Sequence, residues 1–311
     1  MALRIDAEPS RDAVLLEASP PPVTRWGAVP PRRFLDIPDG PRIAYVEAGS
    51  GPDLILVHGA VMTLDDMWLG PMEALSRHFR VVAIDRPGHG ESEHIRLSDA
   101  SLWRQADILR EVSRALQLTR PILVGHSFGG AVCLAFGMAY PDETGGVVAI
   151  SPICFPELRL EQILFGPRAS PVGGEALSRM LSGSDAMLMP LLWRAMFLPQ
   201  RMPERFAAEF PFRLAGQHRR LVADGENANL LWGDLSRSAI SYATCRVPVA
   251  ILCGSADIVT NPLVHGRQAA RLIPGATFRW LHGLGHMLHH FEVDAVMDAA
   301  LDIERRRGDE A

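Results

Sequence analysis

The sequence holds little that would join the chain by disulfide bonds or anchor it in a membrane. Its 311 residues include only four cysteines, which show no paired spacing: Cys133, Cys154, Cys245 and Cys253. Two of them lie inside apolar runs that indicate core elements, so we expect buried free thiols in a reducing compartment. No stretch reaches the roughly 18 uninterrupted apolar residues that a membrane-spanning helix requires. We therefore expect a cytoplasmic protein without a transmembrane segment.

The N-terminal segment and the charge balance exclude further classes of protein. Residues 1–20 carry six charged side chains, which rules out the apolar core of a secretory signal. Acidic residues are frequent there, which argues against a transit peptide. A formal net charge of −5 and a pI near 6.1 argue against nucleic acid as a partner. With 48% hydrophobic residues, a chain of this length can bury a large core.

Apolar runs typical of buried strands alternate with helix-like segments over most of the chain. This alternation predicts parallel strands joined by crossover helices. We expect strands at residues 33–37, 43–47, 54–58, 81–85, 122–125, 147–151, 248–254 and 277–281. Between about residues 152 and 244 the alternation breaks, and short helical pieces separated by prolines take its place. The sequence contains no internal repeat.

A serine stands at a sharp junction between one predicted strand and the helix that follows it. Ser127 follows the apolar run 121–124 and is flanked by Gly125 and Gly129. Glycine at these two positions suits a turn in which a β-carbon would strike neighbouring backbone. The strand, Gly-x-Ser-x-Gly and helix together predict a nucleophile elbow that holds the Ser127 hydroxyl clear of the sheet.

A nucleophilic serine needs a general base and an acid, and both have candidates later in the chain. Asp257 lies just beyond the strand at 248–254, at the carboxyl edge where parallel sheets place their sites. His286 follows the next strand and stands between Gly285 and Met287 in a glycine-containing loop. The order serine, acid, histidine is the order of the α/β-hydrolases. The long interval between Ser127 and Asp257 leaves room for an inserted domain.

These motifs, with two more near the N-terminal end of the sheet, carry a family resemblance. The chain resembles the α/β-hydrolase superfamily, in the branch with a helical cap inserted after the sixth strand. The matching motifs are His58-Gly59, Asp85-Arg86-Pro87-Gly88-His89-Gly90-Glu91-Ser92, Gly125-His126-Ser127-Phe128-Gly129-Gly130, Gly254-Ser255-Ala256-Asp257 and Gly285-His286. The resemblance implies an α/β fold with a mostly parallel eight-stranded sheet flanked by helices.

The resemblance also implies how the chain is divided and where its oxyanion hole lies. We expect a Pro-rich arm, a core in two parts, a cap between them and a tail, at residues 1–31, 32–151 with 245–307, 152–244 and 308–311. One backbone N–H of the oxyanion hole should come from Phe128, the residue after the nucleophile. By resemblance the other comes from Ala60, which follows His58-Gly59.

Several other polar residues have simpler structural interpretations. His58 is expected to shape the oxyanion loop, and His126 to pack beneath the nucleophile. The segment that begins at Asp85 resembles a structural turn of the family. His289 and His290 could imitate a metal cluster, but no carboxylate or cysteine is spaced with them along the chain. We therefore expect no metal and no other cofactor.

The predicted cap is rich in aromatic and sulfur-containing side chains that bear on the substrate. Its methionines include Met180, Met187, Met189, Met196 and Met202. Many of these side chains must form the core of the cap itself. Those that lie over Ser127 would roof an apolar, adaptable pocket. This composition favours a medium or bulky hydrophobic ester as the small-molecule substrate.

The sequence thus predicts a cofactor-independent, carboxylesterase-like serine hydrolase with the triad Ser127, Asp257 and His286. Serine at position 127 excludes the haloalkane dehalogenase and epoxide hydrolase mechanisms, which use an aspartate nucleophile. The same machinery would serve a lactonase, a thioesterase, a carbon–carbon bond hydrolase or a perhydrolase. A ligand receptor that kept the hydrolase fold is an alternative of another class. The sequence leaves the oligomeric state open.

Overall fold

The computed structural model describes residues 23–24, 27–28 and 31–309. Most of the Pro-rich arm predicted for residues 1–31 lies outside the described residues. Within it, β1 (Val23–Thr24) pairs antiparallel with β2 (Gly27–Ala28). None of the helices in the described part of the chain combines the length and apolar character needed to cross a bilayer.

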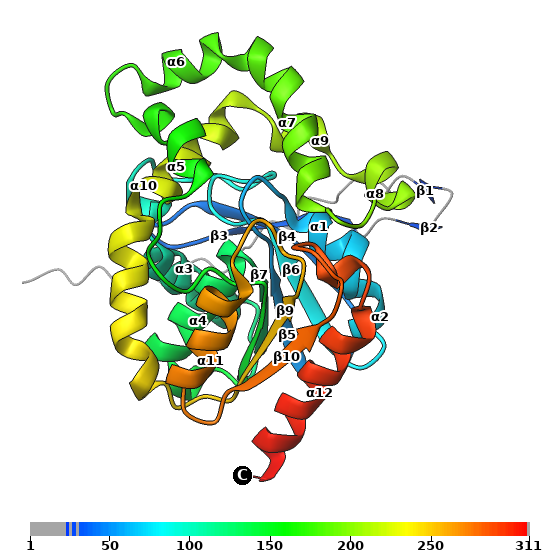
Figure 1. The fold of residues 1–311 in the computed structure, drawn as a ribbon. Helices are drawn as coiled ribbons and strands as arrows, with labels where there is room; N and C mark the ends of the chain where they lie inside the picture. The colour runs from blue at the N-terminus through cyan, green and yellow to red at the C-terminus, as the bar shows by residue number, and fades with distance from the viewer. Residues whose placement is uncertain (1–22, 25–26, 29–30, 310–311) are drawn as a thin grey trace, which may run out of the picture.

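An eight-stranded sheet forms the centre of the molecule (Figure 1). The strands lie in the order β10-β9-β8-β7-β5-β6-β4-β3. Neighbours from β10 to β6 pair in parallel, while β4 pairs antiparallel with both β6 and β3. The predicted α/β fold with a mostly parallel eight-stranded sheet is therefore confirmed.

The strand ends differ from those expected by no more than one residue at either end. The strands are β3 (Arg33–Asp36), β4 (Arg42–Ala48), β5 (Asp53–Val57), β6 (Arg80–Ile84), β7 (Ile122–His126), β8 (Gly146–Ile150), β9 (Val249–Gly254) and β10 (Thr277–Leu281). The apolar runs predicted them well because the central strands are buried on both faces.

Successive strand residues enter two separate hydrophobic cores on opposite faces of the sheet. In β5, Ile55 and Val57 pack into one core, while Leu54 and Leu56 pack into the other. The first core is covered by α3 (Leu102–Ala115), α4 (Phe128–Ala139) and α11 (Gln268–Leu272). The second is covered by α1 (Leu64–Met67), η1 (Trp68–Met72), α2 (Glu73–Leu75) and α12 (Val293–Asp309).

Between β8 and β9 the chain forms a group of helices, which we call the cap. They are α5 (Leu160–Leu164), α6 (Gly174–Met180), α7 (Ser182–Met196), α8 (Glu204–Glu209), α9 (Phe212–Ala215) and α10 (His218–Ser241). In Figure 1 they lie above the carboxyl edge of the parallel strands, and α10 descends beside α3. A third core, which includes Phe165, Trp193, Phe197 and Phe206, holds the cap together.

Short helical turns complete the connections. They are η2 (Ser98–Ala100), η3 (Pro141–Glu143), η4 (Gly166–Ala169), η5 (Tyr242–Thr244), η6 (Pro262–Arg267) and η7 (Leu288–His290). The four cysteines are free and buried, in agreement with the expectation of free thiols. The division into arm, core, cap and tail at the expected residue numbers stays a prediction.

Candidate active site

The turn between β7 and α4 holds Ser127 in a strained backbone conformation. Its φ of 52° and ψ of −115° lie in a region that L-residues rarely adopt. A β-carbon on Gly125 would strike the carbonyl of Gly129, and one on Gly129 would strike the carbonyl of Val57. Both glycines are thus required by the tightness of the turn. The geometry is that of the elbow expected from the sequence.

Asp257 and His286, which are expected to form the rest of the triad, lie side by side. The Nδ1 atom of His286 is 2.8 Å from Oδ2 of Asp257. The other oxygen, Oδ1, accepts hydrogen bonds from the backbone N–H groups of Val259 at 2.8 Å and Thr260 at 2.9 Å. The Thr260 hydroxyl donates to Oδ2 at 2.7 Å.

These contacts fix the charge state of Asp257. Burial alone would raise the pKa of the Asp257 carboxyl. The neighbouring His286 and the hydrogen bonds from Thr260 outweigh burial and hold this pKa well below its ordinary value. The carboxylate is therefore ionised over the whole physiological range and can orient the His286 ring.

The remaining ring nitrogen of His286 has no partner among the described residues, and His286 lines the same pocket as the serine. Nε2 of His286 is buried and has no hydrogen-bond partner among the described residues. Ser127 and His286 both line one pocket between the sheet and the cap. The structure thus brings the three predicted triad residues to one edge of the sheet, with Nε2 left free to exchange a proton.

The predicted oxyanion donors flank the serine. Phe128 is the first residue of α4, and Ala60 lines the pocket together with Ser127. The next residue, Val61, has a φ of 52°, which is strained for a β-branched side chain. Its N–H donates to Asp224 Oδ1 at 3.0 Å, and its carbonyl accepts from Trp193 Nε1 at 3.0 Å. Two cap helices, α7 and α10, therefore hold the loop after β5 in place.

A buried arginine supports the same loop from below. Arg86 donates through Nε to the carbonyl of His58 at 3.1 Å and through a terminal nitrogen to that of Gly59 at 3.0 Å. Its guanidinium lies 4.3 Å from the centre of the Phe128 ring. Burial lowers the pKa of Arg86 to about 10, so it remains a cation at neutral pH. In the sequence Arg86 belongs to the segment that resembles a structural turn of the family, and its contacts with the loop agree with that interpretation.

His58 and His126 occupy structural positions, as expected. Nε2 of His58 accepts a hydrogen bond from the backbone N–H of Arg86 at 3.0 Å, so this ring nitrogen is unprotonated. His126 is fully buried, and its Nε2 lies 3.2 Å from the carbonyl oxygen of His286. Neither side chain lines the pocket that holds Ser127.

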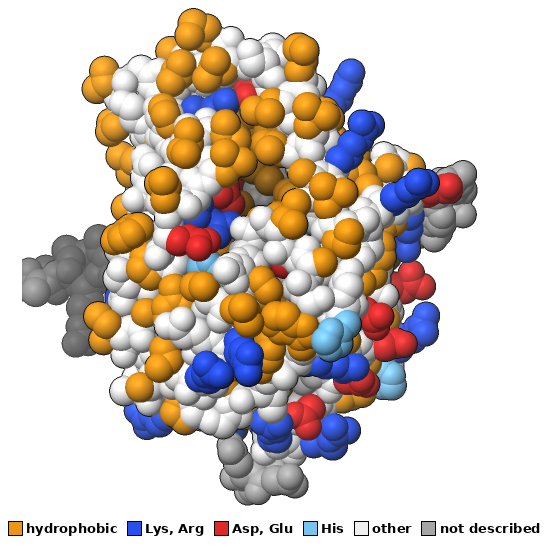
Figure 2. Space-filling model, in the orientation of Figure 1, with side chains coloured by type: hydrophobic (Ala, Val, Ile, Leu, Met, Phe, Trp, Pro, Cys, Tyr) orange, Lys and Arg blue, Asp and Glu red, His pale blue; other side chains and the backbone are white. Residues whose placement is uncertain are grey.

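The pocket has a volume of about 290 Å³ and mainly apolar walls. The cap contributes Leu158, Leu160, Leu164, Phe165, Leu192, Ala195 and Met196. Figure 2 shows orange side chains around a hollow between the cap and the sheet domain. Leu158 and Ile258, which line the pocket, are also exposed at the surface.

The expectation that methionine and aromatic side chains of the cap roof this pocket is confirmed only in part, by Met196 and Phe165. Of the five methionines considered, only Met196 lines it. Met180 and Met187 are exposed, whereas Met189 is buried in the core of the cap beside Trp193. Which face of a cap helix meets the pocket depends on how the helices pack together, and the methionine count carries no such information. Leucines make most of the apolar wall instead.

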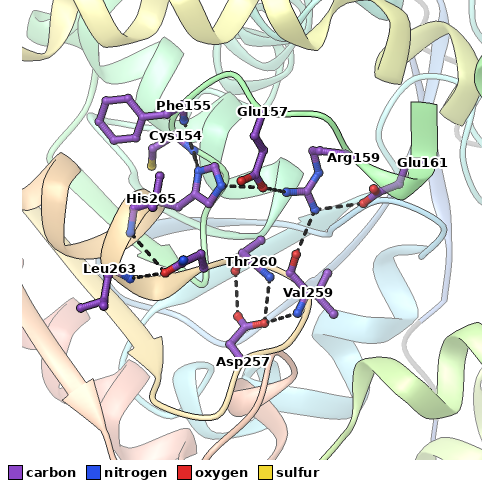
Figure 3. A network of polar contacts seen from close by, with 12 residues as sticks. Cys154, Phe155, Glu157, Arg159, Glu161, Asp257, Val259, Thr260, Leu263 and His265 are labelled. Atoms are coloured by element: carbon purple, nitrogen blue, oxygen red, sulfur yellow. Dashed lines mark hydrogen bonds and ion pairs between the residues drawn. The ribbon is translucent and has the colours of Figure 1, made fainter. Parts of the chain in front are cut away.

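One wall of the pocket is charged, which the sequence did not suggest (Figure 3). Arg159 is 5% exposed and contacts Glu157 at 2.8 Å and Glu161 at 3.1 Å. It also donates to the carbonyl of Val259 at 3.4 Å, within the loop that carries Asp257. Arg159 thereby links the segment that leads into the cap to the loop that carries Asp257.

His265 continues this network away from the pocket. Its Nδ1 accepts hydrogen bonds from the backbone N–H groups of Cys154 at 3.0 Å and Phe155 at 3.2 Å. Nδ1 is therefore unprotonated, and Nε2 lies 2.8 Å from Glu157 (Figure 3). Burial lowers the pKa of His265, in agreement with a neutral ring.

Comparison with known proteins agrees with the fold. A family model described as "Alpha/beta hydrolase family" matches residues 54–299. A protein of Mycobacterium tuberculosis described only as uncharacterized is 28% identical over 271 residues, covering 81% of this chain and 74% of the relative.

Two further likenesses involve named hydrolases. (E)-2-((N-methylformamido)methylene)succinate hydrolase of Acinetobacter baylyi is 35% identical over 98 residues, or 32% of this chain and 36% of that protein. The crystal structure of a hydrolase from Pseudomonas aeruginosa PA01 superimposes with a TM-score of 0.65 and 25% identity. That match covers 88% of this chain and 97% of the other.

Proposed function

The chain belongs to the alpha/beta hydrolase family, and we propose that it is a serine hydrolase that cleaves carboxylic esters with a hydrophobic acyl group. One observation carries the proposal. A serine on a strained elbow shares an apolar pocket with a histidine whose other ring nitrogen lies 2.8 Å from a buried aspartate. This arrangement suits proton removal from a serine hydroxyl that attacks a carbonyl.

In the proposed mechanism Ser127 Oγ attacks the ester carbonyl while Nε2 of His286 takes its proton. The backbone N–H groups of Ala60 and Phe128 stabilise the charge on the former carbonyl oxygen. His286 then donates the proton to the leaving alcohol, and an acyl-enzyme remains on Ser127. A water molecule, deprotonated by His286, attacks this ester and releases the acid. Asp257 holds the ring and stabilises its cationic form throughout.

The role of Ser127 is tested by its removal. Ser127→Ala should lower kcat on 4-nitrophenyl esters by roughly 10⁴-fold or more, as losses of triad serines do elsewhere. A fluorophosphonate probe should modify the peptide that contains Ser127 in the wild type. Ser236 on α10, whose hydroxyl bonds only to its own helix, offers the control Ser236→Ala with unchanged labelling. Full activity in Ser127→Ala, or a label elsewhere, would reject the assignment.

The apolar pocket predicts which acyl chains are preferred. Each methylene that enters apolar surroundings contributes up to about 0.8 kcal/mol, so two added carbons should raise kcat/KM by roughly tenfold. Leu192→Phe should fill part of the pocket and move the preferred chain length toward shorter acyl groups. Met180→Ala, at an exposed position of the cap, should leave the profile unchanged. A flat profile in the wild type would refute the hydrophobic-ester proposal and leave the triad proposal standing.

Other acyl compounds fit the same machinery. A matched panel of ester, thioester, lactone and carbon–carbon bond substrates with one common acyl chain separates these reactions by kcat/KM, and added peroxide tests for perhydrolase activity. If the protein is instead a ligand receptor, a compound will raise Tm strongly while its turnover stays negligible. Turnover of any member of the panel that is lost in Ser127→Ala would exclude the receptor.

A further inference from the structure

A buried group of one carboxylate and several histidines lies behind the loop that carries His286. Nε2 of His289 is 3.1 Å, and Nε2 of His290 is 2.9 Å, from Oδ1 of Asp66. The sequence indicated no carboxylate partner for these histidines, and that expectation is wrong. The fold supplies Asp66 from more than 200 residues earlier, because η1 packs against η7.

A third histidine faces the other oxygen of the same carboxylate. Nδ1 of His126 is 3.7 Å from Oδ2 of Asp66, and neither atom has a hydrogen-bond partner among the described residues. Nε2 of His126 lies 3.2 Å from the carbonyl of His286, which can only accept. The ring proton of His126 is therefore on Nε2, and Nδ1 presents a free lone pair toward Asp66.

This carboxylate has one oxygen, Oδ2, without a hydrogen-bond partner among the described residues. Asp66 is fully buried, and its ion pairs within the described part of the chain are all with histidines. The sequence contains no lysine at all. Two buried acceptor atoms, Oδ2 of Asp66 and Nδ1 of His126, thus face each other with no donor between them among the described residues, an arrangement that a bound cation would stabilise.

We propose that Asp66, His289 and His290 bind a divalent transition-metal ion, Zn²⁺ in the first place, with His126 as a further ligand. The donor atoms of the first three residues lie within 4.8 Å of one another. Bonds of about 2.0 to 2.1 Å to a tetrahedral zinc ion place its ligands roughly 3.3 Å apart, close to the separations of 2.9 and 3.1 Å seen here. Imidazole and carboxylate donors suit this ion.

Two features of the surrounding structure support a metal site at this position. The helical segment from Leu64 to Leu75 is kinked at Gly70, where φ is −102° and ψ is −112°. A β-carbon on Gly70 would lie 3.1 Å from the His289 ring and 3.4 Å from the His290 ring, so glycine leaves space for both. The hydrogen bond from His126 to the His286 carbonyl resembles the outer-shell contacts that orient metal-bound imidazoles.

Such an ion would join three segments that are distant in sequence: the end of β7, α1 and η7. It would stabilise the loop that carries His286 without contacting the reacting atoms. This inference does not depend on the proposed ester hydrolysis. Its test therefore uses metal binding and thermal stability as readouts, and activity is not required.

The experiment uses the full-length chain, first stripped with EDTA and then freed of chelator. Titration with Zn²⁺ alone should show one tight site by calorimetry, and metal analysis of the reloaded protein should give one equivalent. Zinc at about 100 times its dissociation constant should raise Tm by several degrees, since the ion binds the folded state. No tight site and no rise in Tm in the wild type would overturn the proposal.

Two variants locate the ion, and a third serves as the control. Asp66→Asn keeps the shape of the side chain and removes its charge, while His290→Gln removes one ligand. Each should weaken zinc binding by more than the roughly 10- to 100-fold that loss of an outer-shell partner costs. His282→Gln, at an exposed histidine, should bind zinc as the wild type does. Undiminished binding in both ligand variants would likewise overturn the assignment.

Discussion

Asp85 and Asp257 each follow a parallel strand at the same edge of the sheet, yet they lie in different surroundings. Asp85, after β6, accepts hydrogen bonds from the backbone N–H groups of Leu64 at 2.7 Å and Glu91 at 2.9 Å. One oxygen thus closes the turn to Glu91, and the other holds the start of α1. Asp257 receives two backbone bonds on one oxygen and leaves the other for Thr260 and His286.

The charge states of the two aspartates differ accordingly. Burial raises the pKa of Asp85 to about 7, because neither Arg32 nor the two backbone donors compensate fully for the lost hydration. The pKa of Asp257 is held well below its ordinary value because His286 and Thr260 outweigh burial. A position after a strand is therefore shared by both aspartates, whereas an imidazole partner in the pocket distinguishes Asp257 as the candidate acid.

The largest expected effect separates the two aspartates by activity. Asp257→Asn should lower kcat by roughly 10⁴-fold with little change in KM, the loss that this change causes in a serine protease triad. Asp85→Asn should leave kcat per folded molecule within a few-fold of the wild type. Steady-state kinetics, corrected by titration of active sites with a fluorophosphonate, measure both. The reverse result would mean that Asp85 is the acid.

The second prediction separates them by the pH dependence of stability. Since the pKa of Asp85 is raised on folding, its contribution is fully present below the unfolded value of about 4 and is lost as pH rises through about 7. The resulting decrease in the free energy of unfolding is at most roughly 4 kcal/mol. In Asp85→Asn the free energy of unfolding should fall less steeply between pH 5 and 8 than in the wild type.

The pKa shift of Asp257 has the opposite effect on the pH dependence of stability. Its lowered pKa stabilises the folded state above pH 4, and that contribution disappears only as pH falls through its folded pKa. Between pH 5 and 8, Asp257→Asn should therefore shift the stability curve without changing its slope. Urea unfolding at several pH values measures both variants. Parallel curves for Asp85→Asn and the wild type would refute a raised pKa of Asp85.

The same contrast shows how far the sequence could predict this molecule. The five central strands, β5 to β9, were predictable because parallel strands buried on both faces leave continuous apolar runs. The elbow at Ser127 was predictable because only glycine fits at Gly125 and Gly129. Asp257 and His286 were placed by their order and by strand ends, and the structure brings them together.

What the sequence could not predict depends on contacts between distant segments. The leucine wall of the pocket follows from the packing of cap helices, and the clustering of methionines misled us about it. The approach of Asp66 to His289 joins segments more than 200 residues apart. The residues of the charged wall around Arg159 stand at no regular sequence distance from the triad residues, so no sequence pattern indicated them. The functional roles of Ser127, Asp257, His286, Ala60 and Phe128 stay predictions.

The smallest expected effects concern the hydroxyls that support each aspartate. Thr260 Oγ1 donates at 2.7 Å to the oxygen of Asp257 that faces His286, so Thr260→Val removes a bond to the charged acid and keeps the shape. A hydrogen bond to a charged group is worth about 1.5–3 kcal/mol. If part of this energy stabilises the transition state, its loss should lower kcat by roughly tenfold. KM should change little, because the variant alters no atom of the pocket wall.

The matched change beside the other aspartate should affect stability alone. Ser92 Oγ donates to the Asp85 carbonyl and accepts from the Ala44 N–H, both at 2.8 Å. Ser92→Ala leaves a buried N–H unpaired, which should cost about 1–3 kcal/mol of unfolding free energy. Its kcat per folded molecule should equal that of the wild type. If Ser92→Ala lowers kcat as much as Thr260→Val does, the turn at Asp85 takes part in catalysis, and the distinction between the two strand ends fails.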